Sequence, residues 1–306
     1  MRIGLVDLDT SHPGAWLPII REMGHMVVGV WDGGSVHPKG YADQFARSNK
    51  IDRVYESLDE MAASVDCAIL HGCNWDLRVD RARPFISSHK AVLFDKPIAG
   101  NPIHLKMLLN WADAGSIVTG GSSLRFCNEV SKWKLRPLAE RGEPHTVFCG
   151  CGVDEFNYGI HAYSMMAGLM GPGIVSVRHL GEHGQRRILV KWKDGREAYV
   201  VVGEAQKYLP FYATVLTDRG VSHIEADNNH LYRALLTTTL PYLSGNTKPP
   251  VSFNELIEPE LAAIAAERSR KDGGQEVLIH SLFDTDPGYD GYAFAKAYRL
   301  QKYPSR

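Results

Sequence analysis

Two stretches of the sequence carry side chains that can transfer protons. Lys96 stands between Asp95 and Pro97 in FDKPIAGNP. A lysine beside a carboxylate, held extended by the following proline, is a candidate proton donor or electrostatic stabiliser, although a surface Lys–Asp pair has the same spacing. His161 lies near the start of an apolar helical segment, residues 157–171. A histidine there serves as a general acid or base, or simply as a partly buried, hydrogen-bonded residue.

Polar residues also follow the first apolar run of the chain, in GLVDLDTSHPG at residues 4–14. Asp7 and Asp9 stand where a nucleotide-binding turn carries glycines, and carboxylates pointing inward would repel a pyrophosphate. We therefore expect both to turn away, to cap the turn or to act through water. Thr10 and Ser11 are expected to donate hydroxyls and to cap the next helix, whose N-terminal amides face the anion site.

Two further runs end in residues that can contact a ligand. Asp32 ends HMVVGVWD, where a carboxylate accepts both ribose hydroxyls of an adenosine and repels a 2′-phosphate. Asp32 is equally explained as a cap for the turn at Gly33-Gly34. His71 and Asn74 end the next run, and His12 follows the first, so these side chains are also candidates for the cleft.

The elements that must position these residues alternate through the N-terminal half. Short apolar runs near 3–8, 25–32, 65–72, 90–97 and 116–121 are separated by helical patterns near 13–23, 41–49, 58–64, 77–88 and 103–114. This order is typical of a doubly wound parallel sheet, which binds ligands beyond the carboxyl ends of its strands. Pro18 lies one turn into the first helical pattern, so that helix is expected to start late or to bend.

The pattern changes after residue 121. Strands are predicted at 174–180, 187–192, 196–202, 211–217 and 221–225, with tight turns in KDGRE and TDRGVS that indicate antiparallel hairpins. A basic amphipathic helix at 129–140 precedes the strand HTVFCGCG, and helices near 229–244 and 254–271 close the domain. The aromatic tail at 288–304 is expected to pack on its own fold or on a neighbouring copy.

Composition limits the class of protein. The 306 residues favour two domains, and a net charge of −1 predicts neither nucleic acid nor an anionic membrane as a partner. With no apolar run long enough to span a bilayer and no leader pattern, we expect a cytoplasmic protein. Five cysteines argue against a disulfide framework, and Cys149-Gly-Cys151 has no second pair with which to bind a metal. His179 and His183 lack a convincing third ligand, so no metal is predicted.

With these pieces placed, the chain resembles the Gfo/Idh/MocA family (glucose–fructose oxidoreductase, inositol dehydrogenase and relatives) over almost its whole length. Asp95-Lys96-Pro97 is similar to the family's Glu-Lys-Pro motif. GSSLRF, at residues 121–126, resembles the segment that enters the second domain. NYGIHAYSMMAGLMG resembles the Asp-x-Gly-x-His-x-x-Asp helix, with His161 at the histidine. Asn157 and Ser164 replace the two aspartates of that helix.

The resemblance implies an N-terminal Rossmann domain, residues 1–121, and a C-terminal α/β domain with a large, mostly antiparallel sheet, residues 122–306. It implies a nicotinamide cofactor, with NAD preferred to NADP on account of Asp32. The activity implied is hydride transfer at a carbinol carbon of a sugar, polyol or cyclitol. The implied catalytic residues are His161, which takes the hydroxyl proton, and Lys96, which polarises the same oxygen. A homo-oligomer formed through the C-terminal sheet is also implied.

The predicted binding residues follow from these positions. The cofactor set is Asp9, Thr10, Ser11, His12, Asp32, His71, Asn74 and Lys96, and the substrate set is Arg125, Asn157, Tyr158 and Tyr163. The aspartates in the first turn and the missing helix carboxylates leave a second hypothesis open. In it, redox turnover is lost or altered, and the protein binds a sugar-like ligand or acts as a lyase or isomerase. A purely structural or regulatory oligomer explains the fold but not Lys96 together with His161.

Overall fold

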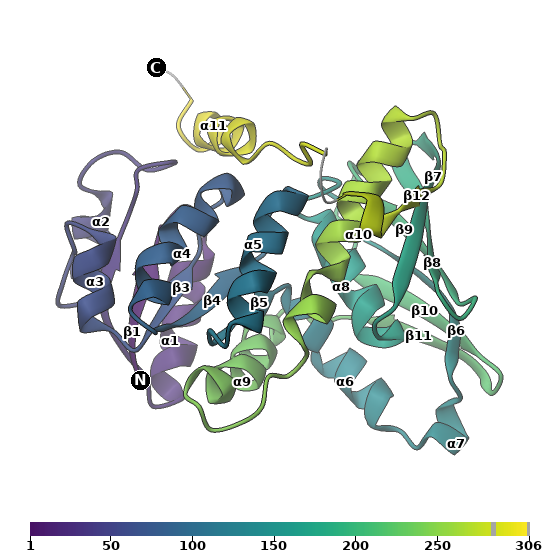
Figure 1. Cartoon of the computed structure of the whole chain (residues 1–306), viewed down its shortest axis with the longest axis horizontal. Helices are drawn as coiled ribbons and strands as arrows, with labels where there is room; N and C mark the ends of the chain where they lie inside the picture. The colour runs from purple at the N-terminus through teal and green to yellow at the C-terminus, as the bar shows by residue number, and fades with distance from the viewer. Residues whose placement is uncertain (283–285, 305–306) are drawn as a thin grey trace.

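The computed structural model describes residues 1–282 and 286–304, which form two sheets lying side by side (Figure 1). The first sheet is parallel, with five strands in the order β2-β1-β3-β4-β5. Its strands are β1 (Arg2–Val6), β2 (Met26–Trp31), β3 (Cys67–Leu70), β4 (Ala91–Asp95) and β5 (Val118–Gly121). The helices between them are α1 (His12–Glu22), α2 (Tyr41–Ser48), α3 (Leu58–Ser64), α4 (Arg78–Ser87) and α5 (Pro102–Asp113). All residues of β3 and β4 are buried, as expected for a sheet covered on both faces.

The second sheet has seven strands in the order β11-β10-β6-β9-β8-β7-β12, and only the β6–β9 pair is parallel. The strands are β6 (Pro144–Gly150), β7 (Ile174–His183), β8 (Gln185–Trp192), β9 (Glu197–Val202), β10 (Tyr212–Thr217), β11 (Gly220–Glu225) and β12 (Val277–Leu278). Two long helices, α8 (Gly159–Met170) and α10 (Phe253–Lys271), pack against it. The predicted α/β fold is therefore confirmed, including both hairpins.

The single helix predicted at 129–140 was wrong, and so was one of the two alternatives given for Pro18, a late start of the first helix. The segment 129–140 forms two short helices, α6 (Asn128–Leu135) and α7 (Leu138–Arg141). Pro137 disfavours a helical conformation at Arg136, which has φ −61° and ψ 142°. In contrast, α1 begins at His12, so Pro18 lies inside the helix and does not delay its start. Three short 3₁₀ turns complete the described structure, at Trp75–Leu77, Ser123–Phe126 and Ile279–Leu282.

Two C-terminal segments return to the first sheet. Helix α9 (Leu231–Leu243) packs on α1, and its Leu235 and Leu240 share one apolar cluster with Leu5 and Trp16. Helix α11 (Gly291–Lys302) lies above the edge of this sheet at which its strands end (Figure 1). The aromatic tail therefore packs on its own fold. None of the described helices is both long and apolar enough to cross a bilayer.

Candidate functional site

A cavity of about 190 Å³ lies where the two sheets meet, and both predicted catalytic residues line it. Its lining consists of His12, Lys96, Ser123, Tyr158, His161, Tyr208, Phe211, Asn228, Leu231 and Tyr232. His12 begins α1 and Lys96 follows β4, so these two come from the edge of the first sheet. The other residues follow Gly121 in the chain. The structure thus brings Lys96 and His161 together, although they lie far apart in the sequence.

Lys96 is held at the cavity wall by Asn157. Its Nζ donates to the Asn157 backbone carbonyl and to Asn157 Oδ1, both at 3.0 Å, and lies 5.5 Å from the centre of the Tyr158 ring. Burial lowers the pKa of Lys96, while the charges of Asp95 and Asp154 oppose that shift. The side chain is therefore not half of a surface Lys–Asp pair. Asn157, which replaces an aspartate of the family pattern, contributes this contact through its amide oxygen.

His161 is buried at the start of α8. Its Nδ1 lies 2.6 Å from Ser122 Oγ, and the Phe211 ring stands edge-on with centres 4.9 Å apart. Burial lowers the pKa of His161 well below its ordinary value, and the nearby positive charge of Lys96 adds to the shift. His161 is therefore a neutral imidazole at neutral pH.

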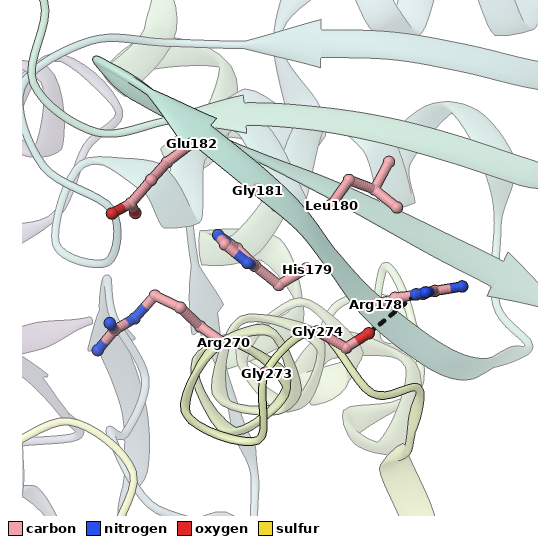
Figure 2. A pocket seen from close by; sticks show the side chains of 8 residues that line it. All are labelled: Arg178, His179, Leu180, Gly181, Glu182, Arg270, Gly273 and Gly274. Carbon is pink, nitrogen blue, oxygen red and sulfur yellow. Dashed lines mark hydrogen bonds between the residues drawn. The ribbon is translucent and has the colours of Figure 1, made fainter.

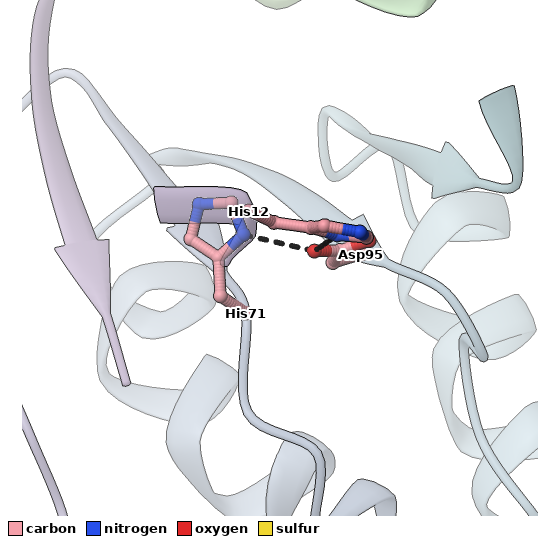
Figure 3. Close-up of side chains that lie close together, drawn as sticks. All are labelled: His12, His71 and Asp95. Carbon is pink, nitrogen blue, oxygen red and sulfur yellow. Dashed lines mark hydrogen bonds and ion pairs between the residues drawn. The ribbon is translucent and has the colours of Figure 1, made fainter. Parts of the chain in front are cut away.

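A second histidine, His12, also lines the cavity, and it shares the carboxylate of Asp95 with His71 (Figure 3). His12 Nδ1 and His71 Nδ1 lie 2.6 and 2.9 Å from the same oxygen, Asp95 Oδ2. Burial alone would raise the pKa of Asp95, but the two imidazoles hold it well below the usual range. Burial lowers the pKa of His71. The sequence placed these residues at strand ends, but it did not reveal that they share one carboxylate.

These three residues also bring possible metal ligands together, since one ligand atom from each lies within 4.8 Å of the others. The N···O distances of 2.6 and 2.9 Å are those of hydrogen bonds. A zinc ion bound at roughly 2.0–2.2 Å to each ligand atom would require these atoms to move apart. The geometry as folded is that of a carboxylate orienting two imidazoles.

The aspartates of the first turn point into the protein. Asp7 has φ 63°, a left-handed conformation that aspartate tolerates better than most residues. Its carboxylate pairs with Arg81 of α4 and accepts a hydrogen bond from Gly33 N at 3.2 Å. Burial raises the pKa of Asp7 to about 7. Asp9 Oδ2 accepts from Cys73 N at 2.9 Å, and its Oδ1 is buried without a partner among the described residues.

The remaining predicted cofactor residues make local contacts. Thr10 Oγ1 accepts from His12 N at 3.2 Å, whereas Ser11 stands at the N-cap of α1 without a side-chain hydrogen bond to the helix. The expectation that Ser11 caps the helix through its hydroxyl was therefore wrong. Asp32 Oδ1 accepts from Gly34 N at 2.9 Å, which is the turn-cap geometry. Asn74 Oδ1 accepts from Asp76 N at 3.2 Å and caps the first 3₁₀ turn.

The C-terminal tail is anchored at both ends of α11. At its start, Gly291 N donates to Asp76 Oδ2 at 2.7 Å, in the segment that follows β3. At its end, Lys302 Nζ donates to the Asp9 carbonyl at 3.1 Å, in the turn after β1. Between these points, Ala295 forms a small apolar cluster with Val36 and Cys73.

The helix therefore crosses the ends of β1, β2 and β3, where a doubly wound sheet binds a dinucleotide. The first turn also lacks the glycines that allow a pyrophosphate to approach the backbone. As folded, these residues do not fit a dinucleotide. The sequence showed the altered turn, but not that the tail covers it.

The predicted substrate residues divide into two groups. Tyr158 lines the cavity and Asn157 holds Lys96 beside it. Arg125 does not line it, because its guanidinium pairs with Glu255 at 2.6 Å. Tyr163, on α8, is buried in the core and does not line it either. Tyr208, Phe211 and Tyr232, which the sequence did not single out, do line the cavity.

A larger hollow of about 570 Å³ lies elsewhere, between β7 and the end of α10 (Figure 2). Arg178 is held to the Gly274 carbonyl at 2.9 Å, on the opposite side from Glu182 and Arg270 (Figure 2). This hollow is open and lacks both predicted catalytic residues. The five cysteines are buried free thiols, and none of them lines either hollow. The smaller cavity is the better candidate for chemistry because Lys96 and His161 line it.

Comparison with known proteins shows similarity of structure only. No protein-family model matches the sequence, and no curated protein sequence matches it significantly. Myo-inositol dehydrogenase from Lactobacillus casei, solved with NAD(H) and myo-inositol, is 16% identical, with 95% of this chain and 99% of that chain covered and a TM-score of 0.74. Scyllo-inositol dehydrogenase from the same organism, with NAD(H) and scyllo-inositol, is 14% identical, covering 92% and 99%, with a TM-score of 0.76. An oxidoreductase from Thermotoga maritima is 15% identical, covering 92% and 99%, with a TM-score of 0.76. The chain thus has the fold of Gfo/Idh/MocA dehydrogenases.

Proposed function

We propose that this protein is an enzyme acting at the CH–OH group of a small polyhydroxylated compound, a sugar, polyol or cyclitol. The observation that carries the proposal is the convergence of Lys96 and His161 on one cavity of about 190 Å³. That volume is below the roughly 300–1,000 Å³ of pockets for drug-sized ligands, which suits a compact substrate. The inositol dehydrogenases of the same fold support this substrate class.

The residues of the cavity have separate roles in this proposal. Lys96 donates a hydrogen bond to the reacting oxygen, and its lowered pKa suits it to proton transfer. His161, neutral and held by Ser122, contacts the same group. Tyr158, Tyr208 and Asn228 provide hydroxyl and amide groups for the other substrate hydroxyls.

Two forms of such an enzyme differ in whether a dinucleotide takes part. A nicotinamide-dependent oxidoreductase is supported by the neighbours crystallised with NAD(H). In this form Asp32 favours NAD over NADP. The second form has altered redox turnover, as an isomerase or lyase, and two observations favour it. Helix α11 covers the ends of β1 to β3, and the two aspartates of the first turn are buried where glycines would be needed. The geometry therefore favours a redox-neutral reaction in the conformation described.

Ligand binding and dinucleotide binding are tested separately. We expect calorimetry to detect binding of myo-inositol or a related compound to the full chain, and Lys96→Ala to weaken it at least about tenfold, as loss of a charged hydrogen bond predicts. Lys106→Ala, an exposed change on α5, is the matched control. Full binding by Lys96→Ala would remove that residue from the site.

NADH and NADPH are then titrated by fluorescence, and the denatured protein is examined for carried-over cofactor absorbance. The redox-neutral form predicts no carried cofactor and no tight binding of either dinucleotide to the full chain. Tight NADH binding would instead establish the oxidoreductase form. Tighter binding of NADPH than of NADH would contradict the role given to Asp32.

A further inference from the structure

His12 is oriented by a partner that can only accept hydrogen bonds. Asp95 is ionised, and its Oδ2 lies 2.6 Å from His12 Nδ1, so Nδ1 must carry the hydrogen. A neutral His12 ring then has a lone pair on Nε2. The ring stacks on Trp16 with centres 5.6 Å apart, and Tyr232 stands edge-on at 5.0 Å, so its plane is fixed. His12 Nε2 forms no hydrogen bond with any residue in 1–282 or 286–304. This atom is not fully buried either, because it is absent from the buried polar atoms that lack a partner.

His161 has the opposite arrangement. Ser122 Oγ accepts a hydrogen bond from Leu124 N at 3.1 Å, so its single proton is free to be donated. The atom at 2.6 Å from this hydroxyl is His161 Nδ1. Among the described residues this hydroxyl has no other acceptor for its proton, so it donates to Nδ1, and the neutral ring then carries its hydrogen on Nε2. His161 Nε2 is likewise absent from the buried polar atoms that lack a partner. Both rings line the cavity, so both Nε2 atoms are open to a ligand there.

We infer that His12 and His161 present Nε2 atoms of opposite polarity to one cavity, His12 as a base and His161 as a hydrogen-bond donor, for enolisation of a small hydroxy-carbonyl compound. This inference rests on the proposed function, because it uses the same cavity and narrows the substrate to a polyhydroxylated compound with a carbonyl group. Asp95 and Ser122 are positioning residues that set the two tautomers.

The reaction balances without a dinucleotide. His12 Nε2 takes the proton from the carbon next to the carbonyl, and the C–H electron pair forms the carbon–carbon double bond of an enediol. The carbonyl π pair moves onto oxygen, which takes a proton from the Lys96 ammonium while His161 Nε2–H donates a hydrogen bond. In the second half, His12 returns its proton to the former carbonyl carbon. The neighbouring hydroxyl gives its proton to the Lys96 amine, so an aldose and a ketose interconvert and both residues regain their starting states.

The tautomers are tested on the full chain without a substrate. Two-bond ¹H–¹⁵N spectra of ¹⁵N-labelled protein distinguish Nδ1–H from Nε2–H rings, and His12→Gln and His161→Gln assign the signals. We expect His12 in the Nδ1–H form and His161 in the Nε2–H form. Ser122→Ala should release His161 into a mixture of tautomers. The inference is overturned if both rings have the same tautomer or the assignment is reversed.

The chemistry is tested by hydrogen exchange at carbon. Dihydroxyacetone and 2-keto-myo-inositol are incubated with the full chain in D₂O without dinucleotide, and loss of their exchangeable C–H signals is followed by ¹H NMR. We expect the protein to accelerate exchange of at least one probe and His12→Gln to slow it roughly 100-fold or more. His280→Gln, an exposed change, should leave the rate unaltered.

The outcomes separate this inference from the proposed function. Exchange that persists in His12→Gln, or the absence of exchange with both probes, overturns the base role and the carbonyl substrate class. In either case, calorimetric binding of a polyol that depends on Lys96 would leave the proposed function intact. Loss of all polyol binding would overturn the proposed function, while the two tautomers would still be read from the spectra.

Discussion

Glu260 of α10 is a buried carboxyl group whose side chain forms no ion pair among the described residues. Its Oε1 accepts a hydrogen bond from Ile98 N at 3.1 Å, and its Oε2 is buried with no partner in the same part of the chain. Burial raises the pKa of Glu260 from 4.5 to about 7. Because the folded state binds the proton more tightly than the unfolded chain, the stability from this group is fully present below pH 4.5. It is lost as the pH rises through 7.

We therefore predict that Glu260→Gln flattens the decline in stability between pH 5 and pH 8. At pH 8 the gain in unfolding free energy is expected to be on the order of 3 kcal/mol at most, the equivalent of the pKa shift. Urea unfolding followed by circular dichroism at both pH values measures it. Asp7, whose pKa is also raised to about 7, titrates in the same range, so part of the slope should remain. Glu225→Gln, an exposed change on β11, is the control; an unchanged slope in Glu260→Gln would contradict the prediction.

Single residues were predictable where a local motif carries the signal. Lys96 and His161 each stand in a recognisable motif, and the structure brings both to one cavity. The partners of Asp95 were not predictable, because His12 and His71 lie 83 and 24 residues away in the chain. Only the strand order, with β1, β3 and β4 adjacent, brings the three residues together. The sequence pattern indicates that strands end near one another, but not which side chains then bond.

At the scale of elements, the docking of α11 depends on glycines in the tail. Gly288 has φ 65°, and a Cβ there would lie 1.9 Å from the Gly100 carbonyl oxygen. A Cβ on Gly291 would lie 2.8 Å from Asn74 Oδ1 and 2.9 Å from Asp76 N. Trp75 Nε1 adds a hydrogen bond to the Tyr289 carbonyl at 2.7 Å. The backbone of the tail therefore lies directly against the segments that follow β3 and β4.

We predict that Gly288→Val loosens α11, because the new side chain meets backbone that cannot yield. Hydrogen exchange measured by mass spectrometry should show faster exchange in residues 291–302. NADH, titrated by fluorescence, should bind this variant more tightly than the unaltered chain, since the ends of β1 to β3 become open. Gly245→Val is the matched control, because Gly245 has φ 75° and a Cβ there would meet no described atom within 4 Å. Equal protection of α11 in the two variants would show that Gly288 does not govern docking.

Elements were predictable where periodicity and capping agree. Helix α3 runs from Leu58 to Ser64, as predicted, and Ser57 caps it by accepting a hydrogen bond from Glu60 N at 3.2 Å. The prediction of a single helix at 129–140 was wrong because Pro137 interrupts the helix despite the amphipathic pattern. The position of α11 could not be derived from the sequence, because its anchors, such as Asp9 and Asp76, lie more than 200 residues away in the chain.

At the scale of the whole molecule, the second sheet has one face covered by helices and one face uncovered by the described residues. The uncovered face carries aromatic and aliphatic side chains beside the charged pair Lys191 and Glu197. Phe148 is 43% exposed and stacks on Tyr199 with ring centres 4.9 Å apart. Leu189 and Val201 lie on the same face, since Leu189 pairs with Tyr199 and Val201 stands two residues further along β9. The neighbouring Cys149 points the other way, toward α8. Aromatic and aliphatic groups gathered on an exposed sheet face are typical of a protein–protein interface.

We therefore propose that this face joins copies of the chain, and that Phe148 and Tyr199 are central to the contact. Sedimentation velocity at micromolar concentration should show a dimer or larger assembly. The double change Phe148→Lys and Tyr199→Lys should raise the dissociation constant at least about 100-fold, because two aromatic anchors are lost and like charges face each other. Leu135→Lys, at an 83% exposed position on α6, is the matched control and should leave assembly unchanged. The same circular dichroism spectrum for all three proteins would exclude misfolding, and a monomeric unaltered chain would refute the proposed interface.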